Sequence, residues 1–165
     1  TAVAAAAASA VTSAHSAAAG AAAAATVTAA AEVASSSFFV QAGASIVLTT
    51  TWRLDADQRS FLLEALGVVG LSDAVLGEVP HLMSASRGDE VRAWLQEHPE
   101  VSVCVAIDDS DAHVASLSET LTPGRVVQTA MHVPGDEAAE GLSDEKVDMV
   151  IRIFRAQLDS CDLMT

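Results

Sequence analysis

Two clusters of oxygen-bearing side chains follow short apolar runs in this sequence. The run 46–48 ends at Thr49-Thr50-Thr51, and the run 101–107 ends at Asp108-Asp109. Short apolar runs rich in β-branched residues are typical of buried parallel strands. In an open α/β sheet, ligands bind beyond the carboxyl ends of such strands. Hydroxyls at one strand end and carboxylates at another therefore predict a site for a phosphate and a divalent metal.

Asp108 and Asp109 are the candidate metal ligands. Successive side chains of a strand alternate in direction, so one carboxylate can face the crevice while the other braces it. Asp111 adds a further hard oxygen donor of the kind that Mg²⁺ prefers. Aspartate is also common in turns and at helix caps, so a structural role for this cluster stays open.

Thr49 and Thr50 are the candidate phosphate donors, because a hydroxyl at a strand end can donate to a phosphoryl oxygen. Their alternative role is to stabilise the strand and to cap the helix that follows. Arg87, at the start of a predicted helix, could offset the charge of a transferring phosphoryl group; a solvated surface arginine would fit the same position. Arg53 is predicted either to bind an anionic substrate or to pair with an acidic neighbour.

The elements that must position these residues alternate between helix and strand. The expected elements are a helix ending at Gly43, a strand at 46–48, a helix at 55–66, a short strand near 75–76, a helix from 86 to 98, a strand at 101–107, a short helix or loop at 114–121, a strand at 125–129 and a helix from Ser143. This order predicts a Rossmann-like three-layer α/β sandwich with a mostly parallel sheet.

The first 34 residues differ in composition from the rest, with 20 alanines and one charged residue, Glu32. The sequence therefore predicts an Ala-rich low-complexity segment at 1–35 and one α/β domain at 36–165. Alanine drives membrane insertion weakly and no basic flank is present, so neither a membrane partner nor a secretory signal is expected. A cytoplasmic location is expected, with organellar targeting by the Ala-rich segment as the alternative. The two cysteines, Cys104 and Cys161, fit a reducing compartment.

The net charge of −14 restricts the partners of this chain, and all eight Lys and Arg residues lie at or after Arg53. Nucleic-acid backbones are bound by clustered lysine and arginine, so no extended nucleic-acid surface is expected. A local pocket for a phosphorylated small molecule or a nucleic-acid end is compatible with this charge. The scattered histidines are predicted to be surface or turn residues.

Four segments, taken in this order, resemble the haloacid dehalogenase (HAD) superfamily, and more narrowly the small HAD domains that are also fused within RNA-repair proteins. The segments are Ile46-Val47-Leu48-Thr49-Thr50-Thr51-Trp52-Arg53, Arg87-Gly88-Asp89-Glu90-Val91-Arg92-Ala93-Trp94-Leu95, Val105-Ala106-Ile107-Asp108-Asp109 and Gly141-Leu142-Ser143. The resemblance covers residues 36–158.

This resemblance implies Mg²⁺-dependent hydrolysis of a phosphate monoester. The motif II hydroxyl would be Thr49, with Thr50 as the next candidate, and the motif III cation would be Arg87. The motif IV acids, which hold the metal, would be Asp108 and Asp109.

The sequence departs from this family at the nucleophile. The family's motif I is a strand ending in Asp-x-Asp, whose first aspartate attacks phosphorus and whose second protonates the leaving group. No aspartate precedes Asp55, and Glu32 has no strand in front of it, so no nucleophile is found. We therefore expect an inactive or fragmentary phosphohydrolase domain. We also expect an incomplete sheet, unless a segment such as 25–33 fills the place of the missing strand.

Two other functions stay open, so whether the chain is an enzyme is left undecided. A non-catalytic HAD-like domain would bind a phosphorylated ligand or a protein partner. Asp109-Ser110-Asp111 also has the Asp-x-Asp pattern of the metal clamp in nucleotide-sugar transferases. The chain lacks a recognisable nucleotide-binding half, which disfavours that interpretation.

Overall fold

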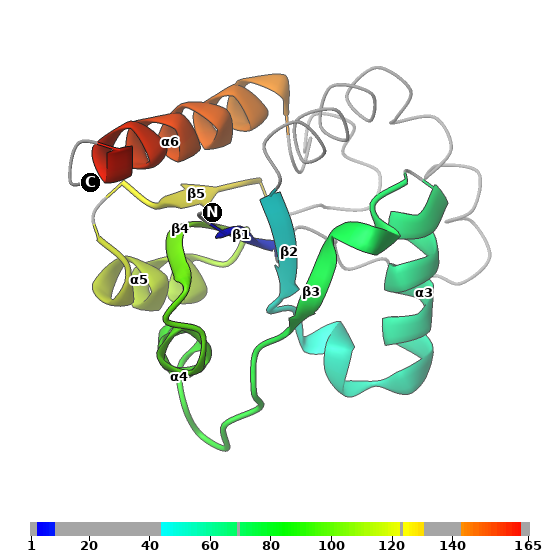
Figure 1. Cartoon of the computed structure of the whole chain (residues 1–165). Coiled ribbons are helices and arrows are strands. Elements are labelled where there is room, and N and C mark those ends of the chain that lie inside the picture. The colour runs from blue at the N-terminus through cyan, green and yellow to red at the C-terminus, as the bar shows by residue number, and fades with distance from the viewer. Residues whose placement is uncertain (1–2, 9–43, 69, 123, 131–142, 163–165) are drawn as a thin grey trace.

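The computed structural model describes residues 3–8, 44–68, 70–122, 124–130 and 143–162, which form a parallel sheet with helices on both faces (Figure 1). The strands in this part of the chain are β1 Val3–Ala8, β2 Ala44–Leu48, β3 Val75–Glu78, β4 Val101–Asp108 and β5 Val126–Gln128. The helices are α3 Ala56–Val68, α4 Arg87–Glu97, α5 Asp111–Thr120 and α6 Asp144–Asp162. The strand order is β3-β2-β1-β4-β5, and each neighbouring pair is parallel. The predicted Rossmann-like α/β sandwich is confirmed.

The centre of the sheet is β1, which belongs to the Ala-rich segment. Its last residue, Ala8, pairs with Leu48 of β2 on one side and with Ile107 of β4 on the other. Residues 3–8 thus occupy the place that the sequence left without a motif I strand; the alternative segment 25–33 lies outside the described residues. Alanine is a weak strand former, but pairing on both sides satisfies the backbone groups of this strand. The domain boundary at residue 35 stays a prediction, although β1 precedes it.

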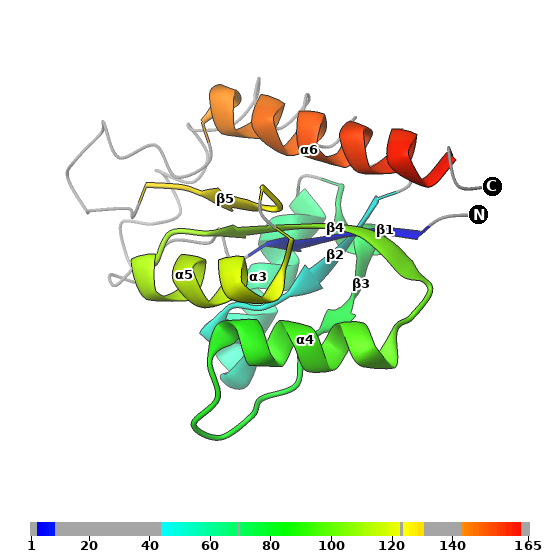
Figure 2. The same ribbon diagram turned by 90° about the vertical axis from the view of Figure 1, so that its left-hand side faces the viewer.

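Helical layers cover both faces of the sheet, because alternate residues of a strand point to opposite faces. In β4, Val105 packs in one cluster with Phe154 of α6. Cys104, the next residue back, packs in another cluster with Trp94 of α4 and Leu117 of α5. Figure 2 shows the resulting layers, with α6 on one side of the sheet and α4 and α5 on the other. Burial raises the pKa of the Cys104 thiol, as is usual for a cysteine that packs as a small core residue.

Helix α3 covers the same face as α6. Ile46 and Leu48 of β2 pack on Leu62 of α3, and Ala44, which points to the same side of that strand, belongs to the α6 cluster. The helix predicted to end at Gly43 falls outside the described residues. Among the helices that the structure describes, none is long and apolar enough to cross a membrane.

Helices α4 and α5 approach each other closely at Gly88. A Cβ atom there would overlap the Ser116 carbonyl oxygen and lie 2.6 Å from Thr120 Oγ1. Gly88→Ala is therefore expected to lower the free energy of unfolding by about 1–3 kcal/mol, because the two helices would have to separate. Urea denaturation measures this loss. Gly77→Ala is the control, since its Cβ would meet nothing within 4 Å; equal losses in both variants would contradict the close contact.

Candidate functional site

The parallel register brings the carboxyl ends of β1, β2 and β4 to one edge of the sheet. Leu48 and Ile107 lie opposite Ala8 on its two sides. Thr49 directly follows Leu48, and Asp108 directly follows Ile107. These two predicted site residues therefore share one edge of the sheet, two strands or about 10 Å apart.

Asp108 is fully buried at the end of β4. Its Oδ1 accepts a hydrogen bond from the Ser110 amide at 2.9 Å and lies 3.3 Å from His113 Nδ1. Its Oδ2 is buried and has no hydrogen-bond partner among the described residues. A buried polar atom without a partner carries a desolvation cost, which a bound cation would offset. Oδ1 thus has the turn role that the sequence left open, whereas Oδ2 is free to accept a ligand.

The neighbouring aspartates differ from each other. Asp109 is half-buried beside Asp108, whereas Asp111 is exposed and its Oδ1 accepts a hydrogen bond from Gln128 Nε2 at 2.6 Å. Within the part of the chain that the structure describes, no group of three or more His, Cys, Asp or Glu side chains is arranged to hold a metal ion. The donor set on this edge is therefore Asp108 with Asp109. Mg²⁺ is usually bound by one or two carboxylates together with water and phosphate oxygens.

The two candidate hydroxyls have different surroundings. Thr50 Oγ1 accepts a hydrogen bond from the Trp52 amide at 3.3 Å and caps the short 3-10 helix Thr51–Leu54, as the alternative role of this residue predicted. Thr49 is buried directly after β2. Thr50 is buried too, and it is the hydroxyl that caps a helix in the described part of the chain, so Thr49 stays the first candidate for a ligand.

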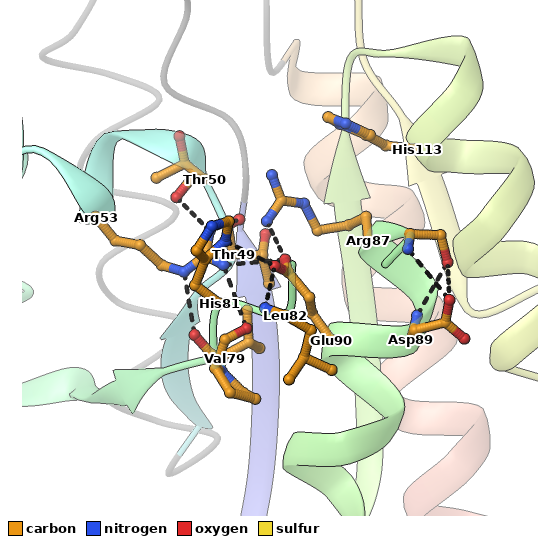
Figure 3. Close-up of polar contacts among 12 residues, drawn as sticks. Thr49, Thr50, Arg53, Val79, His81, Leu82, Arg87, Asp89, Glu90 and His113 are labelled. Carbon is orange, nitrogen blue, oxygen red and sulfur yellow. Dashed lines mark hydrogen bonds and ion pairs between the residues drawn. The ribbon is translucent and has the colours of Figure 1, made fainter. Parts of the chain in front are cut away.

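Arg53 is held by main-chain carbonyl groups. Its Nη1 donates to the carbonyl oxygens of Thr49 and Thr50 at 2.7 and 2.8 Å, and its Nε donates to that of Val79 at 3.1 Å. Its Nη2 donates to Glu90 Oε2 at 2.9 Å (Figure 3). Of the two roles predicted for Arg53, the structure shows pairing with an acidic residue.

Glu90 is shared between two arginines and a loop. Its Oε2 lies 2.9 Å from Arg53 Nη2 and 2.7 Å from Arg87 Nη1, and these three side chains are at most 7% exposed. Its Oε1 accepts a hydrogen bond from the Leu82 amide at 3.2 Å and lies 3.4 Å from His81 Nδ1. Glu90 thus compensates part of the charge of both guanidinium groups, and Asp108 acts on Arg87 as well.

Arg87 is the first residue of α4 and is placed by a capping box, in which Ser86 and Asp89 bond to each other's main chain. Burial and the nearby Arg53 lower the pKa of Arg87, and this effect is opposed by Glu90 and Asp108. Arginine nevertheless stays protonated in proteins. Its Nε is buried and has no hydrogen-bond partner in the described ranges. A bound anion would supply that partner and compensate the buried charge.

A pocket of about 190 Å³ lies beside these groups, and its lining includes Thr51, Arg87, His81 and His113. The side chains of His81 and His113 are 51% and 39% exposed, in line with the predicted surface histidines, and both also line this pocket, which the sequence did not indicate. His113 contacts Asp108 and His81 contacts Glu90. The only signal for His113 is its position in the first turn of the helix that follows the Asp108 strand. Glu90 was also missed, because an acid in a first helical turn is explained by the helix dipole alone.

A parallel sheet with helices on both faces defines this protein as an α/β domain of the Rossmann-like class. The family model described as the HAD domain in Swiss Army Knife RNA repair proteins matches residues 11–147. The chain belongs to this family, which confirms the resemblance seen in the sequence. No match was found among curated proteins or among solved structures. The matched range includes Thr49, Arg87 and Asp108 and begins after β1.

Proposed function

We propose that this domain is a phosphohydrolase-type HAD site that binds a phosphate monoester together with Mg²⁺ at the carboxyl ends of β1, β2 and β4. The observation that carries the proposal is a pair of buried atoms without partners in the described residues, Arg87 Nε and Asp108 Oδ2. The first is a hydrogen-bond donor on a cation, and the second is an acceptor on an anion. A phosphate group suits the first, and a divalent metal ion suits the second.

The residues present fit this assignment. Asp108, with Asp109 beside it, would hold Mg²⁺, and Arg87 and Thr49 would bind the phosphoryl oxygens. The metal ion, when bound, would compensate the charge of those oxygens. The negative charge of the whole chain limits the proposed ligand to a phosphorylated small molecule or a nucleic-acid end.

Hydrolysis in this family needs a carboxylate at the end of the central strand, which is β1 in this chain. The sequence continues from Ala8 with Ser9 and Ala10, which lie outside the described residues, and neither is an acid. We therefore propose that the chain as written binds its ligand without turnover. The second candidate function is a non-catalytic domain that binds a phosphorylated ligand or a protein partner. Binding without turnover corresponds to that function.

The experiment compares turnover with binding in the same preparation. The release of phenol from an aryl phosphate in the presence of Mg²⁺ measures turnover, and calorimetry with inorganic phosphate measures binding. We expect Mg²⁺-dependent phosphate binding and no phenol release above the protein-free blank. Metal-dependent turnover would overturn the non-catalytic part of the proposal, and a lack of phosphate binding would overturn the site itself.

Mutation of the paired acids is expected to weaken Mg²⁺ binding. Asp108→Asn or Asp109→Asn should raise the dissociation constant for Mg²⁺ about tenfold or more, because the amide that replaces the carboxylate removes a negative charge from a small donor set. Isothermal titration calorimetry measures this constant, with circular dichroism to show that each variant is folded. Asp111→Asn is the matched control and should leave it unchanged. Unchanged affinity in both Asp108→Asn and Asp109→Asn would remove the metal site.

A further inference from the structure

Glu90 connects three parts of the molecule that surround the proposed phosphate site. It joins Arg53 of the 3-10 helix after β2, the Leu82 amide in the loop after β3, and Arg87 at the start of its own helix α4. Figure 3 shows the Glu90 carboxylate between the two guanidinium groups, with the loop residues against it. Glu90 is therefore the common partner of elements that are far apart in the chain.

The two arginines differ in how many of their donors are already used. Arg53 donates through Nε and Nη1 to main-chain carbonyl groups and through Nη2 to Glu90. Arg87 has one hydrogen bond within the described part of the chain, from Nη1 to Glu90 Oε2 at 2.7 Å. The donor groups of Arg53 are thus used in structural hydrogen bonds, whereas Arg87 has donor groups left for a ligand.

Arg87 needs an anchor if it is to bind an anion well. A free arginine side chain has much rotamer freedom, and a ligand that had to order it would bind more weakly. Glu90 lies one helical turn further along α4, where an i, i+3 pair meets on the helix surface. Arg53 in turn fixes the Glu90 carboxylate from the opposite side.

We propose that Glu90 is a positioning residue of the phosphate site, which holds the Arg87 guanidinium in place before the ligand arrives. The proposal rests on the proposed function, because it assumes that phosphate binds at Arg87. Glu90 itself is an anion and makes no contact with phosphate in this role.

The direction in which Glu90→Gln changes the affinity for phosphate distinguishes a positioning role of Glu90 from a purely electrostatic one. If Glu90 acted only through its charge, Glu90→Gln would remove a negative charge from beside both arginines and would strengthen the binding of an anion. If Glu90 positions Arg87, the same substitution frees the guanidinium and weakens binding. The positioning role therefore predicts the opposite direction from simple electrostatics.

The test is calorimetric titration of the full chain with inorganic phosphate in the presence of Mg²⁺. Glu90→Gln is expected to raise the phosphate dissociation constant about tenfold, since misplaced binding groups lose affinity on this scale or more. In an Arg87→Met background, the same substitution should cause no further loss. Glu78→Gln, which neutralises an exposed glutamate paired with Arg59, is the control and should leave the constant unchanged. Unchanged or tighter binding by Glu90→Gln overturns the proposal.

A second measurement needs no variant and covers the case in which Glu90→Gln does not fold. In nitrogen-15 spectra of the wild-type protein without ligand, a held Arg87 guanidinium gives separate signals for its two Nη groups. Added phosphate should then shift the Arg87 Nε signal and leave that of Arg53 in place. Averaged Nη signals for Arg87 in the free protein would overturn the positioning role. A wild-type protein that binds no phosphate would overturn the proposed function, and the inference with it.

Discussion

Arg53→Met is expected to lower the free energy of unfolding by about 3–5 kcal/mol, the range measured when one partner of a buried ion pair is removed. The substitution retains much of the apolar stem but deletes every donor of the guanidinium group. Glu90 would lose one of its two cationic partners at 2.9 Å. The carbonyl oxygens of Thr49 and Val79 would lose the guanidinium donors, and buried acceptors left unpaired are costly. The Thr50 carbonyl oxygen would keep the main-chain amide of residue 53 as a donor.

The matched control for this prediction is Arg59→Met. Arg59 also pairs with a glutamate, Glu78, at 3.1 Å, but these side chains are 46% and 41% exposed. Exposed ion pairs contribute about 0–1 kcal/mol, so the control should change the free energy of unfolding by no more than that. Urea denaturation of both variants measures the difference. Similar losses at the two positions would show that burial of the Arg53 network does not stabilise the protein.

The network of Arg53 and Glu90 shows why the sequence predicted where the candidate residues lie better than it predicted what they contact. Arg53 and Glu90 are 37 residues apart in the chain, and no periodic pattern relates an arginine after one strand to an acid in a later helix. The apolar runs that became β2 and β4 were visible because burial on both faces requires continuous β-branched residues. From the sequence alone, the carboxyl ends of these runs therefore predict that Thr49 and Asp108 share one edge of the sheet. The pairing of buried charges depends on tertiary contacts, which single-sequence patterns do not record.

The central strand shows a second kind of limit. Residues 3–8 are one valine and five alanines, so they lack the signal of a buried parallel strand, which is a run rich in β-branched residues. Their position follows from pairing with β2 and β4, whose sequences do carry that signal. The pairing completes the backbone hydrogen bonds between these strands, but it does not supply the carboxylate that the family's chemistry uses. The fold therefore depends on the pairing of this strand, whereas the proposed lack of turnover depends on the side chains that follow it.

Phe154→Ala is expected to lower the free energy of unfolding by about 3–5 kcal/mol, the usual cost of removing a buried phenylalanine side chain. Phe154 is 1% exposed and packs in the cluster between α6 and the sheet with Val103, Val105 and Val150. Val103 and Val105 of β4 are fully buried in a close-packed interior, so the space left by the ring would collapse only in part.

The control for Phe154→Ala is Phe61→Ala, which makes the same chemical change on the surface. Phe61 is 52% exposed, and its ring lies 6.1 Å from that of Trp52 in a tilted arrangement. A pair of this kind contributes about 0.5–1.5 kcal/mol, so the control should lose less than Phe154→Ala. Thermal and urea denaturation measure both variants. Because Val105 belongs to the strand that ends at Asp108, a small loss at Phe154 would mean that α6 does not hold β4 in place, and the buried position of the Asp108 carboxylate would then need another support.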